Sequence, residues 1–297
     1  MPAVIRRSGV SDVLFNTVVY GGVTFALVIC LYPFLYVLSS SVSSSQAVVR
    51  GEVWFWPKGF TLHAYKVVFA DDVVWRSYFN TIWYTVVGTT FNLVCTILGA
   101  YPLSKKRFFA RNFFMMMFVL TMFVYGGMIP TFLVVVKTGL YNTRWAMVVP
   151  TIIGTWNLII CRTFFQNLPE DLFENARMEG AGEFRIIWRI VLPLSTPIVA
   201  VMTLFYGISH WNSFFPALLY LPNAKLHPIQ IYLRRVLIMS RMDTLTQHDT
   251  GEAAEGFLSL LKVKYAVIIV AITPIVMLYP FLQKYFVKGV MIGALKG

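Results

Sequence analysis

Charged residues gather in one short stretch of an otherwise apolar chain, ENARMEGAGEFRIIWRIVLPLSTP at residues 174–197. The chain is 58% hydrophobic and 13% charged, yet the first sixteen residues of this stretch hold six charges: Glu174, Arg177, Glu179, Glu183, Arg185 and Arg189. Such side chains form ion pairs and hydrogen bonds with another surface, so the chemistry they offer is recognition. They do not belong in hydrocarbon, and they indicate a segment at a membrane surface.

No motif for catalysis or for a bound cofactor accompanies this cluster. The sequence has no GxxxxGK[ST] phosphate loop, and EGAGEF lacks the third glycine and the preceding strand of a dinucleotide fingerprint. The four histidines form no HExxH pair, and the three cysteines lie in apolar runs without metal-ligand spacing, as small buried hydrophobes do. We therefore expect a non-enzymatic chain without catalytic residues, metal or cofactor of its own.

The composition indicates an integral membrane protein. The mean hydropathy is +0.68, and 25 of the 297 residues are phenylalanine, which is more apolar surface than a soluble core of this size can bury. A helix needs about 20 apolar residues to cross roughly 30 Å of hydrocarbon. Six windows meet this requirement, so we expect an all-α membrane domain over 13–297 with transmembrane helices near 13–37, 78–104, 112–136, 145–165, 194–221 and 264–283.

The short loops between these windows predict the topology. The loop KKRFFAR at 105–111 is densely basic, and six spans place it on the same side as segment 166–193 and both termini. Because short basic loops stay in the cytoplasm, we expect residues 1–12 and segment 166–193 to be cytoplasmic. We expect the positive net charge of +12 to interact with anionic lipid headgroups. Nucleic acid is not indicated as a partner, because the sequence has no basic stripe interleaved with aromatic residues.

The windows hold almost no charged residue away from their ends. Ion-driven carriers usually place Asp, Glu or Lys within the bilayer, where such groups are costly and need a functional reason. This pattern disfavours ion-coupled transport, although a chain without an ion pathway still moves a solute if a partner supplies the energy.

Segment 166–193 has two physical interpretations. Ala176 and Gly180 are four residues apart, so a helix places them on one small face that another protein can approach closely. Pro193 then begins the next span, where its missing N–H costs least. The alternative is a surface loop that only solvates the ends of two spans, and the physics alone does not choose between them.

The same segment resembles the cytoplasmic signature of permease subunits in binding-protein-dependent ABC importers. That signature reads EAA, three residues, G, nine residues, I, any residue, LP, and its elements are present as Glu174, Ala176, Gly180, Ile190, Leu192 and Pro193. Asn175 replaces the second residue, and Glu179 stands where Asp is commoner. FNT at 79–81 and WNSFFPALLY at 211–220 are similar to the smaller permease of maltose-type sugar importers, in the branch serving oligosaccharides, including alginate.

The resemblance implies a type I importer permease fold in the bacterial cytoplasmic membrane. A second homologous permease would complete the pore, two ATPase subunits would bind ATP and Mg²⁺, and an extracytoplasmic solute-binding protein would deliver an oligosaccharide. A coupling helix within 166–193 would drive alternating access, with ATPase contacts from Glu174, Asn175, Ala176, Glu179, Gly180 and Ala181. Contacts with the binding protein are expected from Arg234, Arg235 and Arg241.

Polar and aromatic residues inside the windows are candidates for the substrate path, namely Trp156, Asn157, Tyr206, His210, Trp211 and Asn212. Aromatic faces stack on sugars, and amides form hydrogen bonds with hydroxyl groups. Helix packing and interfacial anchoring explain the same residues without a substrate. Three other functions remain open: an importer permease for a non-sugar solute, an ion-driven secondary carrier and a structural membrane scaffold.

Overall fold

The computed structural model describes residues 10–124, 126–245, 263–278 and 280, and these form helices and connecting loops with no strand. The predicted all-helical architecture is therefore confirmed for the described part of the chain. The chain falls into two compact units, Met1–Ala70 with Val236–Val270 and Asp71–Arg235 with Ala271–Gly297.

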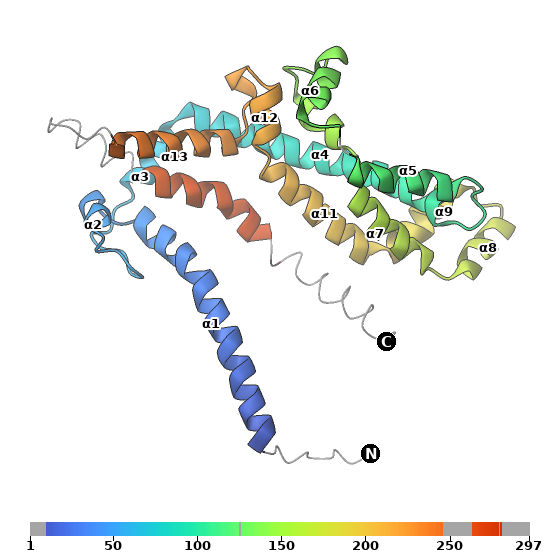
Figure 1. The fold of residues 1–297 in the computed structure, drawn as a ribbon, viewed down its shortest axis with the longest axis horizontal. Coiled ribbons are helices and arrows are strands. Elements are labelled where there is room, and N and C mark those ends of the chain that lie inside the picture. Colours follow the sequence, from blue (N-terminus) through green and yellow to red (C-terminus); the bar gives the residue numbers. More distant parts are fainter. Residues whose placement is uncertain (1–9, 125, 246–262, 279, 281–297) are drawn as a thin grey trace. The chain divides into compact units, whose positions relative to one another are not determined.

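The first unit begins with the 32-residue helix α1 (Val10–Ser41), drawn in blue in Figure 1. Its apolar side chains are exposed along most of its length. A cluster of buried serines lies at the C-terminal end of α1. The hydroxyl of Ser39 donates to the carbonyl of Phe55 at 2.6 Å, and the hydroxyl of Ser43 donates to the carbonyl of Ser39 at 2.6 Å. These bonds turn the chain away from the helix.

Two short helices complete the described N-terminal part of this unit. They are α2 (Ser45–Val49), whose first turn is capped by Ser44, and α3 (His63–Ala70). Between them, Trp54 and Trp56 are both exposed.

The second unit is organised around α4 (Asp72–Ser104), which begins where the carboxylate of Asp71 accepts from the N–H of Val73 at 2.8 Å. The elements that follow α4 are α5 (Arg111–Phe123), α6 (Met128–Lys137), η1 (Arg144–Met147), η2 (Val149–Thr151), α7 (Thr155–Gln166), α8 (Glu170–Met178), α9 (Glu183–Ile186), η3 (Ile187–Val191), α10 (Leu192–Leu194), α11 (Thr196–Trp211), α12 (Phe215–Tyr220), η4 (Ala224–Leu226) and α13 (Ile229–Leu245), of which residues 229–235 belong to this unit. The α4 helix packs chiefly against α11 and α7.

Two described helices are long and apolar enough to cross a membrane by themselves, α1 over Asp12–Ser41 and α4 over Asp72–Ser104. The predicted spans 112–136 and 145–165 are bent pairs of helices instead of single rods, and the window 194–221 begins at a third bend. The bends measure 118° between α5 and α6, 53° between Arg144–Thr151 and α7, and 86° between Glu183–Leu194 and α11. The described part of the sixth window is an apolar helix, Val263–Leu278. Two to five spans are thus present in the described residues by length and composition, and six remains a prediction.

The break before α11 follows from proline. Pro193 has no N–H to donate to the carbonyl four residues earlier, and its ring crowds that carbonyl. The helix widens here into a π turn, η3, and then bends before Thr196, where Pro197 starts α11. The window predicted as one span from 194 to 221 consequently consists of α11 and α12, with a break after Trp211.

Buried polar residues form a stripe along one face of α4. Most of them are separated by three, four, seven or eight residues, as one helix face requires: Ser77, Asn80, Thr81, Tyr84, Asn92 and Thr96. Each interruption of a neighbouring helix leaves carbonyl groups without a donor, and in lipid only the protein itself supplies one. The stripe is therefore positioned to satisfy broken backbone.

Asn92 does this at the break before α7. Its amide nitrogen donates to the carbonyls of Thr151 at 2.6 Å and Ile152 at 2.9 Å, while its oxygen lies 2.7 Å from Nε2 of His210 on α11. One side chain thus joins three segments. One helix turn further along α4, the Thr96 hydroxyl lies 2.7 Å from the Tyr206 hydroxyl.

The other end of the stripe holds the loop after α12. The Asn80 amide donates to the carbonyls of Lys225 at 2.8 Å and His227 at 3.2 Å, and the Tyr84 hydroxyl donates to Leu226 at 2.8 Å. The guanidinium of Arg144 donates to the Asn80 oxygen at 3.1 Å. The polar face of α4 therefore fixes the chain at both breaks that lie against it.

A glycine sets the distance between α4 and α11. A Cβ atom at Gly88 would lie 2.5 Å from Nε2 of His210, closer than real Cβ contacts occur. The imidazole ring therefore occupies the space that any other residue at 88 would need. Small residues permit such close helix contacts in membranes.

We predict that Asn92→Leu destabilises the second unit, because the carbonyls of Thr151 and Ile152 lose their donor at a cost of about 1–3 kcal/mol each. The measurement is thermal unfolding of the full chain in lipid nanodiscs. Asn16→Leu on the exposed face of α1 is the matched control and leaves the transition unchanged. Equal transitions for both variants would contradict the role of Asn92.

Candidate functional site

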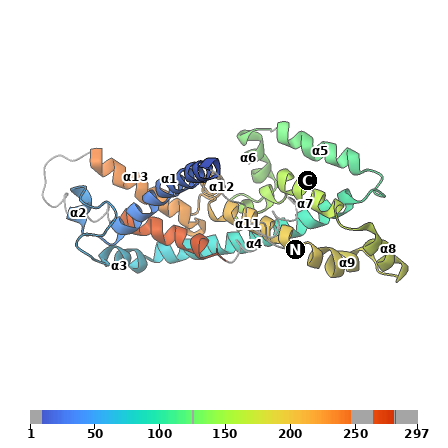
Figure 2. The same cartoon turned by 90° about the horizontal axis from the view of Figure 1, so that it is seen from below.

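The charged segment forms α8 and α9, which lie together beyond one end of α4 in both views (Figure 1 and Figure 2). Pro169 precedes α8, and Glu170 with Asp171 occupies its first turn, where negative charge suits the helix dipole. The helix ends at Met178. The N–H of Gly180 donates to Arg177 at 2.9 Å and the N–H of Ala181 donates to Ala176 at 2.9 Å, which is the bonding pattern of a Schellman motif.

This ending corrects one expectation from the sequence. Ala176 and Gly180 do not share an exposed helix face, because Gly180 lies beyond the helix at φ 77°, in the left-handed region. Ala176 is only 8% exposed and packs with Phe173 into the core cluster that contains Tyr101 and Ile186. The glycine is needed for the reversal of the chain, and the alanine is needed for close packing within the protein.

Glu183 ties this segment to α4. Its carboxylate accepts a hydrogen bond from the hydroxyl of Tyr101 near the end of α4 at 2.5 Å and one from Nε of Arg177 on α8 at 3.1 Å. The candidate coupling residues predicted from the sequence do not include Glu183 or Tyr101. Nothing local in the sequence pairs two residues 82 positions apart, and only the unusual density of charge around Glu183 marked it.

The outward side of α8 and α9 mixes charged and large apolar side chains. Glu174, Asn175 and Glu179 are exposed, while Met178 is 81% and Phe184 is 72% exposed. Surfaces that bind other proteins combine apolar anchors with a charged or polar rim. Within the coupling residues predicted from the sequence, three therefore point outward, Ala176 points inward, and Gly180 with Ala181 forms the exit from the helix.

Lys105 lies at the same end of α4, with its ammonium 2.8 Å from the centre of the Phe173 ring. Burial lowers the pKa of Lys105 from 10.5 to about 8, and the charge of Arg177 acts in the same direction, against Glu170 and Glu183. The amine therefore loses its proton at a lower pH than an ordinary lysine does.

The six substrate-path candidates do not meet in one site. Tyr206, His210 and Trp211 are buried, and the indole of Trp211 donates to the carbonyl of Ala271 at 2.9 Å. By contrast, Trp156 is 63% exposed. Asn157 is half-buried, and Asn212 is exposed. In the described residues, the three buried candidates have partners within the chain, and only the exposed ones are open to a ligand.

The candidates for contact with a binding protein lie on α13. Arg234 and Arg235 are exposed, and the Arg234 guanidinium lies 5.1 Å from the centre of the Phe214 ring. Arg241 belongs to the same helix, and its side chain lies outside the described residues. The two described arginines are accessible to a partner.

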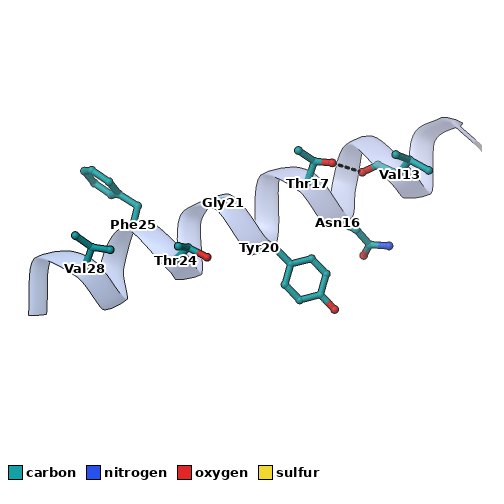
Figure 3. Close-up of a pocket in the computed structure, with 8 residues that line it drawn as sticks. All are labelled: Val13, Asn16, Thr17, Tyr20, Gly21, Thr24, Phe25 and Val28. Atoms are coloured by element: carbon teal, nitrogen blue, oxygen red, sulfur yellow. Dashed lines mark hydrogen bonds between the residues drawn. The ribbon is translucent and has the colours of Figure 1, made fainter. Parts of the chain in front are cut away.

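Two hollows differ in how far the protein encloses them: one lies among several helices, and the other lies along a single helix. A cavity of about 340 Å³ lies among α4, α11 and residues 275–278, and the hydroxyl groups of Thr85 and Thr89 on its wall have no hydrogen-bond partner in the described part of the chain. The hollow in Figure 3 is formed by α1 alone, from Val13 to Val28 around Gly21. It is an open helix surface and encloses no ligand site.

The described residues contain no group of three or more His, Cys, Asp or Glu side chains that would hold a metal ion. The prediction that all three cysteines are buried is wrong for Cys30, which is exposed on α1, and right for Cys161, while Cys95 is intermediate.

Comparison with known families and proteins gives consistent results. Residues 77–292 match the family described as binding-protein-dependent transport system inner membrane component. The polygalacturonan/rhamnogalacturonan transport system permease protein YtcP of Bacillus subtilis (strain 168) is 39% identical over 285 residues, covering 96% of this chain and 99% of that protein. Protein LplC of the same organism is 42% identical over 286 residues, covering 95% and 94%.

One solved structure is similar over nearly the whole fold. It is a chain from a bacterial ABC transporter involved in the import of the acidic polysaccharide alginate, with a TM-score of 0.84 and 33% identity. The similarity covers 96% of this chain and 100% of that chain.

We predict that Gly180→Ala loosens the end of α8, because a Cβ at a left-handed φ costs about 1–2 kcal/mol. Hydrogen exchange of the amides at 180 and 181 is expected to rise about five- to thirty-fold in the full chain. Gly182→Ala is the control, since Gly182 has an ordinary φ of −70° and open space around it. Unchanged exchange in Gly180→Ala would refute the role of this turn.

We predict that acylation of Lys105 by an amine-reactive ester rises with pH through a midpoint of about 8 in the folded chain. Because the folded pKa lies below 10.5, the unfolded chain binds more protons between these values, and stability from this group increases as pH rises through that window. Peptide mapping by mass spectrometry gives the midpoint. The denatured chain is the control, and an equal midpoint in both states would contradict the burial effect.

Proposed function

Since the chain belongs to the family of binding-protein-dependent transport system inner membrane components and is the permease component of a sugar importer of the ABC type, we propose that it moves an oligosaccharide by alternating access. Separate ATPase subunits would drive this movement through segment 166–193. The chain is a transport component and not an enzyme, as its relatives are permeases.

The observation that carries the coupling proposal is the attachment of α8 to α4 through Glu183. A force applied to the outward side of α8 needs a stiff path into the membrane. The hydrogen bonds of Glu183 and the buried Phe173 supply one, because both join α8 to the end of the longest helix in the second unit. Glu174, Asn175 and Glu179 are then the residues available for contact with an ATPase.

The remaining partners follow from the family. A second homologous permease completes the pore, two ATPase subunits hold ATP and Mg²⁺, and an extracytoplasmic solute-binding protein meets α13 at Arg234, Arg235 and Arg241. The proposed location is the bacterial cytoplasmic membrane, with six spans and both termini in the cytoplasm. The dense basic loop at 105–111 supports this orientation.

The substrate proposal rests on the relatives. One similar protein is a transport permease for polygalacturonan and rhamnogalacturonan, and another belongs to an importer of the acidic polysaccharide alginate. An oligosaccharide of uronic acid type is therefore the first substrate to test. Trp156 and Asn212 are the exposed sequence candidates for contact with it, although the Asn212 oxygen accepts a hydrogen bond from the Gln230 amide at 3.4 Å.

We predict that Glu183→Gln lowers ATP-driven uptake at least tenfold, because the amide cannot hold Arg177 and Tyr101 as a carboxylate does. The assay measures labelled oligogalacturonide uptake into proteoliposomes containing the permease pair, the ATPases and the binding protein. Glu52→Gln, in the exposed ion pairs of the first unit, is the control and keeps full uptake.

Three results would contradict the proposal in different ways. Normal uptake by Glu183→Gln would remove the mechanical role of that residue. Uptake driven by an ion gradient without ATPases would identify a secondary carrier. ATP-driven uptake of a non-sugar solute in place of the oligosaccharide would agree with an importer function and contradict the proposed substrate.

A further inference from the structure

A third hollow lies at the end of α4 beside the coupling segment. Its volume is about 240 Å³. Its walls come from the end of α4 and the following loop, the start of α5, the end of α7 and the start of α8: Ser104, Lys105, Lys106, Arg111, Arg162, Phe165, Gln166, Leu168, Glu170 and Phe173. Segments far apart in the sequence therefore converge on one small space.

The charge of this hollow is strongly positive. Four cationic side chains and one carboxylate line it, and none of the four cations forms an ion pair with a carboxylate in the part of the chain that the structure describes. Lys105, Arg111 and Arg162 are half-buried, so water screens their mutual repulsion less than at an open surface. An unpaired cluster of this kind favours an anion.

The geometry also suits an anion with several oxygen atoms. Nε of Arg162 donates to the carbonyl of Leu103 at 3.0 Å, which orients the guanidinium and leaves its other donors available. Helix α5 starts at Arg111 without a side-chain cap on its first amides, and such amides attract negative charge. The buried rings of Phe165 and Phe173 close the inner wall.

Size limits the ligand. At about 30 Å³ for each water, the hollow holds roughly eight water molecules, which is room for a phosphate group and a few attached atoms. A phosphate group matches the planar donor set of arginine and the point charge of lysine. A sugar chain of several rings does not fit this volume.

We propose that this hollow binds a phosphate group, either from an anionic phospholipid headgroup or from a soluble phosphate. The bound anion would join α4, α5, α7 and α8 at the place where α8 is attached to α4. The binding itself does not depend on the proposed transport function.

The test uses the full chain, purified with the subunits that remain bound to it and placed in nanodiscs of phosphatidylcholine alone. Acylation of Lys105 is measured near pH 8. One arm replaces a fifth of the lipid with phosphatidylglycerol, and the other arm adds inorganic phosphate. We expect at least one arm to slow acylation about fivefold or more, because a bound anion favours the charged amine and covers it.

Arg111→Gln and Lys106→Gln are expected to lose most of this protection. The matched control is Arg107→Gln, which removes a charge from the same loop but does not line the hollow and keeps protection. Slowing by lipid alone identifies a headgroup site, and slowing by phosphate alone identifies a soluble ligand.

No protection in either arm overturns the proposal. Equal loss of protection in Arg107→Gln and Arg111→Gln also overturns it, since general surface charge then explains the effect. If a variant does not assemble, the two arms with the unaltered chain still decide. Uptake activity plays no part in these readouts, so a failure here is distinct from a failure of the transport function.

Discussion

A carbonyl group in the interior of a membrane has no water to bond with, so every interrupted helix needs a donor from elsewhere in the chain. In the second unit α4 supplies these donors. Asn92 serves the break before α7, and Asn80 with Tyr84 serves the loop after α12. Bent helices are tolerated here because an unbroken helix with a polar face lies against them. The arrangement of α7, α11 and α12 depends on that face.

The same helix also carries the attachment of the charged segment. Tyr101 lies one turn before the end of α4 and holds Glu183, which in turn holds Arg177 on α8. A polar face within the membrane and a polar anchor at its surface are thus successive parts of one 33-residue helix. A movement of α8 would therefore reach the interior along a single stiff element.

The sequence predicted the helical class, the membrane environment and the family because each depends on composition or on local spacing. The motif around Glu174 and Gly180 is of this kind. Pro150 and Gly154 mark window 145–165 as a kinked or broken helix, but the bends between α5 and α6 and before α11 were not predicted, since average hydropathy does not report the direction of a helix axis. The pairing of Tyr101 with Glu183 was also missed, because it depends on folding across 82 positions.

Gly180 was singled out by spacing, but the structure gives it a different place from the one that the spacing predicts. Spacing placed it on a helix face with Ala176, whereas its backbone is left-handed and its role is to end the helix. The spacing of four residues is the same in both explanations. Only the dihedral angle separates them, and no pattern of side-chain types contains that angle.

The contact between Gly88 and His210 has a consequence for how this interior can change over time. The His210 ring fills the space that a side chain at position 88 would need. The residue that is tolerated at one of these positions therefore depends on the residue at the other. A larger residue at 88 is compatible with the fold only after 210 becomes smaller, and the order of the two changes is fixed. The loss of the imidazole would also free the oxygen of Asn92, so a viable path must give that oxygen a new donor at the same step.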